Sequence, residues 1–195
     1  MKLLYLFLIL TLVSCSAIMG VSEIKEYNSQ NIKIFLNKNK INDSVVYFID
    51  KVFKKTLIAL TNDTLLINHH LQPLQVSYYN KLGNLISYHI NCNAPGFPNL
   101  NWNSNKVMEV FPPKTQTPVD TLLNLRNYLS LLKSNNKISF TAEDDFDYYI
   151  VVCWAGFIKK QSKKLIETVN ENLKLNKENK KIRIIYVNTD NVFLD

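Results

Sequence analysis

Three cysteines carry the most reactive side chains of this 195-residue chain, at positions 15, 92 and 153. A thiol can act as a nucleophile, form a disulfide or carry a lipid, and its surroundings decide which. Cys153 lies inside an apolar run, which favours a small buried hydrophobic residue. A stabilising disulfide between Cys92 and Cys153 and a redox-active pair of the same residues are the alternatives that the sequence leaves open.

The histidines and acidic residues lack the spacing of a metal site. His69 and His70 are adjacent, so on a strand they would point to opposite faces. The acidic cluster at residues 143–147 lacks the Asp-x-Asn-x-Asp-Gly pattern of a calcium loop. No P-loop, G-x-G-x-x-G or Ser-His-Asp arrangement stands out either. We therefore expect no catalytic residue, no metal and no cofactor.

The chain is basic, with a formal net charge of +7. All of its 23 basic residues except Arg126 and Arg183 are lysines. Arginine binds phosphates and bases through bidentate hydrogen bonds, and no arginine cluster is present. The lysines therefore indicate a solvated surface, and we expect no nucleic-acid partner.

The first residues have the pattern of an export signal. Lys2 precedes an apolar run over residues 3–13, which is too short to span a bilayer. The run ends in Leu12-Val13-Ser14-Cys15, which resembles the lipobox of bacterial lipoproteins. This resemblance implies that residues 1–14 are removed and that Cys15 carries the lipid. An ordinary signal, cut after Ala17 with loss of Cys15, is the alternative.

A lipid on Cys15 would anchor the protein in the cell membrane or outer membrane, facing the periplasm or the cell exterior. Residues 15–30 are polar, and we expect a tether that lifts the domain from the membrane. Residues 31–110 are expected to form an α+β region. Apolar residues at helical spacing predict a helix that begins near Asn42 and includes Phe48 and Phe53.

A β-hairpin is the clearest local prediction. Residues 75–79 and 85–90 alternate as strands do, and Gly83 is suited to the turn between them. The loop over residues 91–105 is long and rich in asparagine, and long loops in compact domains are often functional. Its aromatic residues Phe97 and Trp102 make it a candidate binding loop for a protein or a glycan. Further along, Thr117 is expected to cap a helix that ends before Asn135.

The C-terminal third predicts a parallel βαβ unit. Residues 148–154 form a continuous apolar run, an amphipathic helix follows to about residue 176, and a second apolar run covers residues 181–187. The expected fold class is therefore α+β, with α/β character in this third. An exposed edge at the second run would suit a docking partner.

Residues 141–190, within a region expected over residues 117–195, resemble the thioredoxin-like superfamily. Residues 150–155 resemble the family's apolar strand that ends in Trp-Ala, and residues 182–190 resemble the strand that follows its helix and ends in Asp. The family's Cys-x-x-Cys would lie where this chain has Ile158-Lys159-Lys160-Gln161, so dithiol chemistry is not expected there. The family's cis-Pro strand and closing hairpin are not found after Asp190. The sheet then needs other strands, which we expect from residues 56–90.

These patterns predict a lipid-anchored cell-envelope protein whose thioredoxin-like domain is a non-catalytic binding or structural module. The membrane, through the anchor, and a protein or glycan are the expected partners. The alternative is a divergent thiol-disulfide oxidoreductase that uses Cys92 and Cys153.

Overall fold

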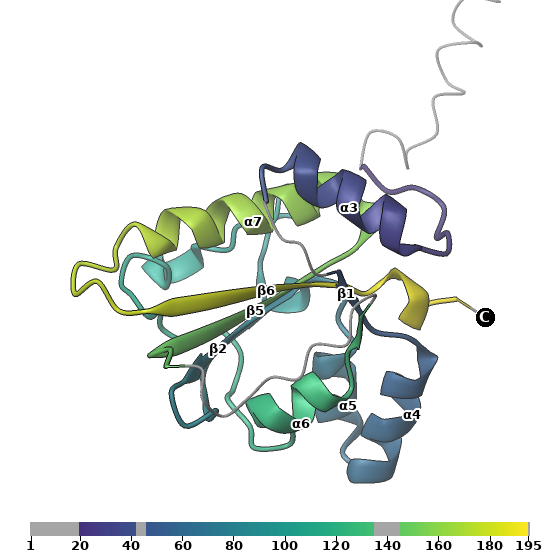
Figure 1. The fold of residues 1–195 in the computed structure, drawn as a ribbon, viewed down its shortest axis with the longest axis horizontal. Coiled ribbons are helices and arrows are strands. Elements are labelled where there is room, and N and C mark those ends of the chain that lie inside the picture. The colour runs from purple at the N-terminus through teal and green to yellow at the C-terminus, as the bar shows by residue number, and fades with distance from the viewer. Residues whose placement is uncertain (1–19, 42–45, 135–144, 195) are drawn as a thin grey trace, which may run out of the picture.

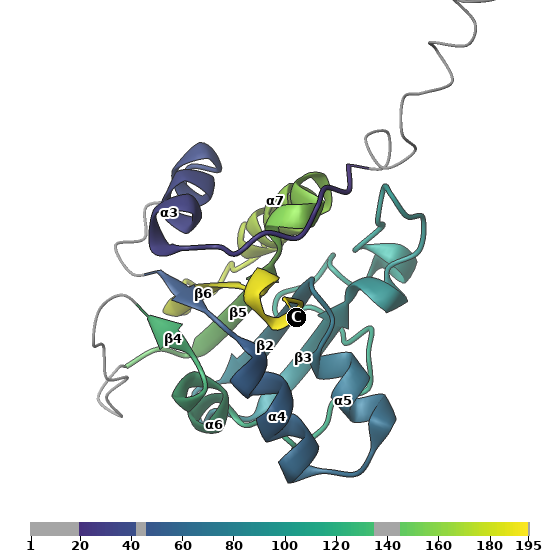
Figure 2. The same cartoon turned by 90° about the vertical axis from the view of Figure 1, so that its right-hand side faces the viewer.

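The computed structural model describes residues 20–41, 46–134 and 145–194 as one mixed sheet with helices on both faces (Figures 1 and 2). The strands lie in the order β3-β2-β5-β6-β1-β4. Their bounds are β1 Tyr47–Phe48, β2 Gln75–Asn80, β3 Leu85–Ile90, β4 Lys133–Ser134, β5 Tyr148–Trp154 and β6 Ile182–Asn188. The helices are α3 Ser29–Lys38, α4 Lys51–Leu60, α5 Thr64–His70, α6 Leu125–Ser130 and α7 Lys159–Leu173. The α+β fold class predicted from the sequence is confirmed.

The sheet separates two hydrophobic clusters. Alternate residues of a strand point to opposite faces, so β5 supplies Ile150 and Trp154 to one cluster and Val151 and Cys153 to the other. Helices α3 and α7 cover the first face, and α4, α5 and α6 cover the second (Figure 1). Burial on both faces explains why β5 is an uninterrupted apolar run.

The parallel βαβ unit is confirmed. Strands β5 and β6 pair in parallel from Tyr148↔Ile182 to Trp154↔Asn188, and α7 connects them. The helix packs its apolar positions Leu165, Ile166 and Val169 against the sheet. It ends at Leu173, slightly earlier than expected.

The hairpin is confirmed as well, and it completes the sheet on one side of β5. Strands β2 and β3 pair antiparallel, and Gly83 has the left-handed φ of 78° that its turn requires. The Asn80 side chain accepts hydrogen bonds from the backbone N–H groups of Leu82 and Asn84, which closes the turn. Strand β2 also pairs antiparallel with β5. Residues 56–60 and 64–68, by contrast, lie in helices α4 and α5.

The prediction of a helix from about Asn42 is wrong in its first part. Residues 42–45 lie outside the described residues, and Tyr47 and Phe48 form β1, paired in parallel with the end of β6. The helix begins only at Lys51, where the Asp50 carboxylate caps it by accepting a hydrogen bond from the Val52 N–H at 2.9 Å. Phe48 therefore fits the spacing of a helix in the sequence, but in the structure it pairs with β6.

The predicted helix start at Thr117 is also wrong. The backbone N–H groups of Gln116 and Thr117 both donate to the Tyr88 carbonyl of β3, so this segment covers the outer edge of the hairpin. Helix α6 begins at Leu125 instead, capped by the Asn124 side chain. The hydrogen bonds to β3 therefore decide the conformation at Thr117, although its residue type favours a helix cap.

Strand β6 is paired on both sides at its carboxyl end, where its sequence suggested an open edge. It lies between β5 and β1, and Tyr47 and Phe48 pair with Val187 and Asn188 at its end. The docking edge expected at residues 181–187 is therefore wrong for this end of the strand.

The described part of the expected tether packs against the domain. The Ser22 N–H donates to the Phe157 carbonyl at 2.7 Å, and Tyr27 exchanges two backbone hydrogen bonds with the Asn191 side chain. Residues 20–30 of the expected tether therefore lie along the surface of the domain, fixed at Ser22 and Tyr27, and Ser29 already begins α3. Among the helices of the described residues, none has both the length and the apolar character needed to cross a membrane.

Candidate functional site

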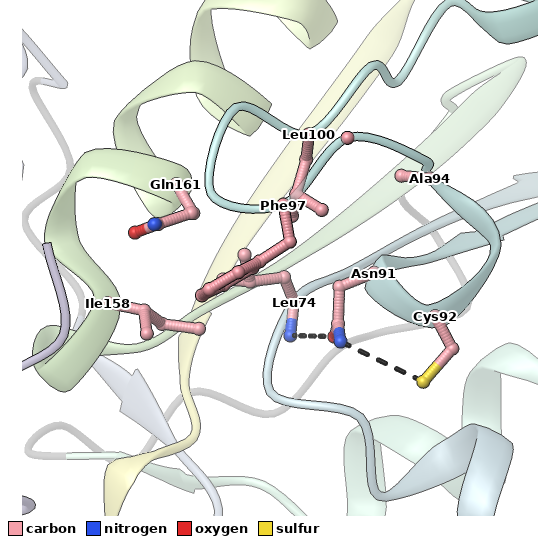
Figure 3. Close-up of a pocket in the computed structure, with 9 residues that line it drawn as sticks. Leu74, Asn91, Cys92, Ala94, Phe97, Leu100, Ile158 and Gln161 are labelled. Atoms are coloured by element: carbon pink, nitrogen blue, oxygen red, sulfur yellow. Dashed lines mark hydrogen bonds between the residues drawn. The ribbon is translucent and has the colours of Figure 1, made fainter. Parts of the chain in front are cut away.

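A pocket of about 290 Å³ lies beyond the carboxyl end of β5, where the chain turns into α7 (Figure 3). The asparagine-rich loop forms its other wall. In sheets with parallel strands this end is the usual place for ligands. The residues that line it are Leu74, Asn91, Cys92, Ala94, Gly96, Phe97, Leu100, Ile158 and Gln161.

Apolar and polar atoms line this pocket in about equal measure, and none of the lining side chains is charged. Leu74, Leu100 and Ile158 are buried parts of the core, so they form a fixed floor. The Phe97 side chain is 53% exposed, and its ring points across the pocket toward Ile158 (Figure 3). Such a site suits an uncharged group that packs an apolar part against this floor and Phe97, because a charged group would lose its hydration without gaining a charged partner.

The polar side of the pocket is built from the ends of the hairpin. Asn91 follows β3, and its side-chain oxygen accepts a hydrogen bond from the Leu74 N–H at 3.2 Å. Its amide nitrogen donates to Gln72 Oε1 at 2.9 Å, and the Cys92 thiol donates to the same oxygen at 2.8 Å. These bonds hold the segments before β2 and after β3 together and fix the rim.

The structure separates the two aromatic residues of the predicted binding loop. Phe97 lines the pocket, whereas Trp102 is only 1% exposed and lies in the hydrophobic core. The role expected for Trp102 at a binding surface is therefore wrong. The loop itself is held by backbone bonds from Asn99 to the Gly96 carbonyl and from Asn101 to the Pro95 carbonyl.

Cys92 and Cys153 are both free thiols, so the candidate disulfide is not formed. Cys153 is 2% exposed and packs in the cluster under α4 and α6. The buried residues of the pocket that Cys92 lines belong to the cluster on the α7 face. Burial raises the pKa of Cys153 to about 12, so this thiol stays protonated and is a weak nucleophile at neutral pH. Cys153 thus matches the interpretation as a buried hydrophobic residue.

Ile158-Lys159-Lys160-Gln161, where the resemblance stated above would place a Cys-x-x-Cys, lies at the start of α7, which the chain enters through the short turn Gly156–Ile158. Ile158 and Gln161 point inward as buried residues, whereas Lys159 and Lys160 are exposed. The buried Asp190 carboxylate accepts hydrogen bonds from the Gly156 and Phe157 N–H groups.

The sequence did not reveal that Asp190 binds the turn at the start of α7. Burial raises the pKa of its carboxyl group, and the backbone donors oppose that shift. Because Asp190 follows β6 after one residue and bonds to the turn after β5, it ties together the carboxyl ends of the two parallel strands. The sequence indicated this role only by placing Asp190 shortly after a buried strand.

A second polar pair that the sequence did not reveal is His70 with Asp120. His70 Nε2 lies 3.1 Å and 3.2 Å from the two carboxylate oxygens, with side chains 3% and 11% exposed. The Tyr88 ring stacks on the imidazole. His89 hydrogen-bonds Ser87, and burial lowers its pKa to about 4. Within the described residues, no three His, Cys, Asp or Glu side chains gather in a way that could hold a metal ion.

Replacing Asp120 with asparagine should remove an acid-sensitive contribution to stability. Burial raises the pKa of Asp120, but the hydrogen bond and charge of His70 outweigh it and leave the pKa below its usual value. The carboxylate therefore stabilises the fold above pH 4 or so, and this contribution is lost as the pH falls through the lowered pKa.

We expect Asp120→Asn to cost about 1–3 kcal/mol at pH 6 and almost nothing near pH 2, as measured by urea unfolding. Asp190 is present in both proteins, so its opposite pH dependence cancels in the comparison. A difference that stays constant between pH 6 and pH 2 would contradict the assignment.

The chain was compared with models of protein families, with characterised proteins and with solved structures, and none of the three comparisons found a match.

Proposed function

We propose that this protein is a lipid-anchored cell-envelope protein whose domain binds an uncharged group with an apolar part, such as a side chain of a partner protein, without catalysing a reaction. The observation that carries the binding role is the pocket at the start of α7, which has a buried apolar floor, no charged lining residue and the half-exposed Phe97 ring across it. The anchor role depends on Cys15, which lies outside the described residues.

A thioredoxin-like scaffold is part of this proposal. The parallel unit β5-α7-β6 supports it, and so does the hairpin β2-β3, which lies antiparallel beside β5. In this chain the hairpin precedes the βαβ unit, whereas the family resemblance implies a closing hairpin after it. Ile158 stands at the pocket where the family motif would begin with a cysteine.

The alternative, a thiol-disulfide exchange between Cys92 and Cys153, receives no support from the geometry. Such an exchange needs an accessible thiolate and a second thiol within bonding reach. Cys153 is buried, and its Sγ lies 3.1 Å from the hydroxyl oxygen of Tyr128 in the core. Cys92 is exposed at the pocket rim but is left without a resolving partner among the described cysteines.

Binding can be tested with small uncharged probes and isotope-labelled protein. We expect a blocked Gly-Leu-Gly tripeptide to shift the backbone NMR signals of Gly96 and Leu100, and a Gly-Asn-Gly tripeptide to leave them in place. Phe97→Ala should weaken binding of the leucine peptide about five- to tenfold, because it removes an apolar contact surface. The fold should be unaffected, since Phe97 is half exposed.

Leu82→Ala is the matched control, because Leu82 is an exposed apolar residue in the hairpin turn and lies outside the pocket. Equal affinity of the two variants would contradict the site. Binding of neutral chitotriose in place of the leucine peptide would assign the pocket to a glycan and overturn the preference for an apolar side chain.

A further inference from the structure

Four exposed lysines form the outer side of the first two turns of α7. We call Lys159, Lys160, Lys163 and Lys164 the basic face. Within α7, the first acidic residue is Glu167, which lies 3.6 Å from Lys163 on the exposed surface. An exposed pair of this kind is weak, so most of the positive charge remains uncompensated.

The N-terminal segment enters the domain at this basic face. A β-carbon placed on Gly20 would lie only 3.2 Å from Cβ of Lys160, and two residues later the Ser22 N–H donates to the Phe157 carbonyl. Cys15 is five residues before Gly20. Five residues span at most about 18 Å when fully extended. A lipid on Cys15 would therefore keep the Lys160 end of the basic face within about 18 Å of the anchored residue.

The pocket lies at the same end of the molecule. Lys164 Nζ donates to the Asn99 carbonyl of the asparagine-rich loop at 3.3 Å, so the basic face adjoins the loop that carries Phe97. Figure 2 shows that the chain enters beside α7, whereas α4 and α5 lie at the opposite end. Membrane contact at the entry end would bring the basic face and the loop toward the lipid together.

We propose that the basic face lies on the anionic headgroups of the membrane that holds the anchor, and that this contact orients the pocket toward the bilayer surface. Lysines near an anionic surface each strengthen such contact several-fold. The short chain between Cys15 and Gly20 favours the membrane over a dissolved anionic polymer, because it keeps the two surfaces together. This proposal rests on the lipid anchor of the proposed function.

The test uses the full-length, membrane-extracted protein with Phe97→Trp as a reporter. It is reconstituted in vesicles of phosphatidylcholine alone or with about 30% phosphatidylglycerol, with bromine atoms on the acyl chains as quenchers. The signal of the buried Trp102 and Trp154 is subtracted by measuring the parent protein. We expect at least threefold stronger quenching of the new indole in the anionic vesicles, and loss of this excess at about 1 M salt, where the Debye length is only about 3 Å.

The charge-reversal variant Lys159→Glu/Lys160→Glu should lose the excess quenching. Acidic residues are favourable in the first turn of a helix, so this change does not weaken α7. Lys54→Glu/Lys55→Glu is the matched control, because it makes the same change in net charge on two exposed lysines of α4 and should keep the excess.

Further outcomes distinguish a failure of the basic-face proposal from a failure of the lipid anchor. The mass of the Cys15 peptide shows first whether the lipid is present. A lipidated protein with equal quenching in both kinds of vesicle would overturn the basic-face proposal and leave the anchor standing, and so would an equal loss in the control variant. An unmodified Cys15 would overturn both.

Discussion

Replacing Cys15 with alanine should remove the lipid anchor completely. Lipid chains contribute about 0.8 kcal/mol per buried methylene, and one diacylglyceryl group already supplies two chains. The described residues contain no helix that could replace the anchor by spanning the membrane. In detergent phase separation, we expect the native protein in the detergent phase and Cys15→Ala in the aqueous phase or as the unprocessed precursor.

Cys92→Ala is the control for this experiment, because it removes an exposed thiol and leaves the signal intact. Its product should stay in the detergent phase with the mass of a lipidated chain. A native protein that begins after Ala17, with no lipid, would contradict the prediction and favour an ordinary signal peptide.

Replacing Trp154 with alanine should have the largest effect on stability. Its fully buried side chain stacks on Phe35 of α3 at a centroid distance of 3.8 Å and meets the edge of the Tyr27 ring at 5.7 Å. Truncating a buried tryptophan costs about 3–5 kcal/mol. We expect a loss of this size in urea unfolding, together with faster proteolysis at Lys25, because Tyr27 and α3 lose the surface that holds the N-terminal segment.

Phe35→Ala and the double variant show how much of this loss comes from the stacked pair. A coupling free energy of about 0.5–1.5 kcal/mol is expected for an aromatic contact. A loss below about 1 kcal/mol for Trp154→Ala, or unchanged proteolysis at Lys25, would contradict the role assigned to this side chain.

Elements whose signal is local could be predicted from the sequence. The hairpin was correct because Gly83 and Asn80 close its turn within a few residues. The βαβ unit was correct because β5 is apolar on both faces and α7 has one apolar stripe. In each case the deciding interactions lie within the element or its immediate turn.

Elements that depend on a distant partner were predicted less well. Phe48 fits a helical spacing with Phe53, but it pairs with Asn188, 140 positions later in the numbering. Thr117 has the residue type of a helix cap, but its N–H bonds to Tyr88 on the hairpin edge. Backbone groups must find hydrogen-bond partners, and a neighbouring strand can satisfy them as well as a helix does.

The candidate site shows the same division. From sequence we could identify the asparagine-rich loop, its aromatic residues Phe97 and Trp102 and the absence of a Cys-x-x-Cys. Packing decided which of the two stays at the surface, because Trp102 fills the core while Phe97 is half exposed. Packing also placed Cys153 beneath α4 and α6, away from the pocket, because alternate side chains of β5 go to opposite faces of the sheet. Local patterns specify elements, whereas the partners of a side chain depend on which distant segments the sheet brings together.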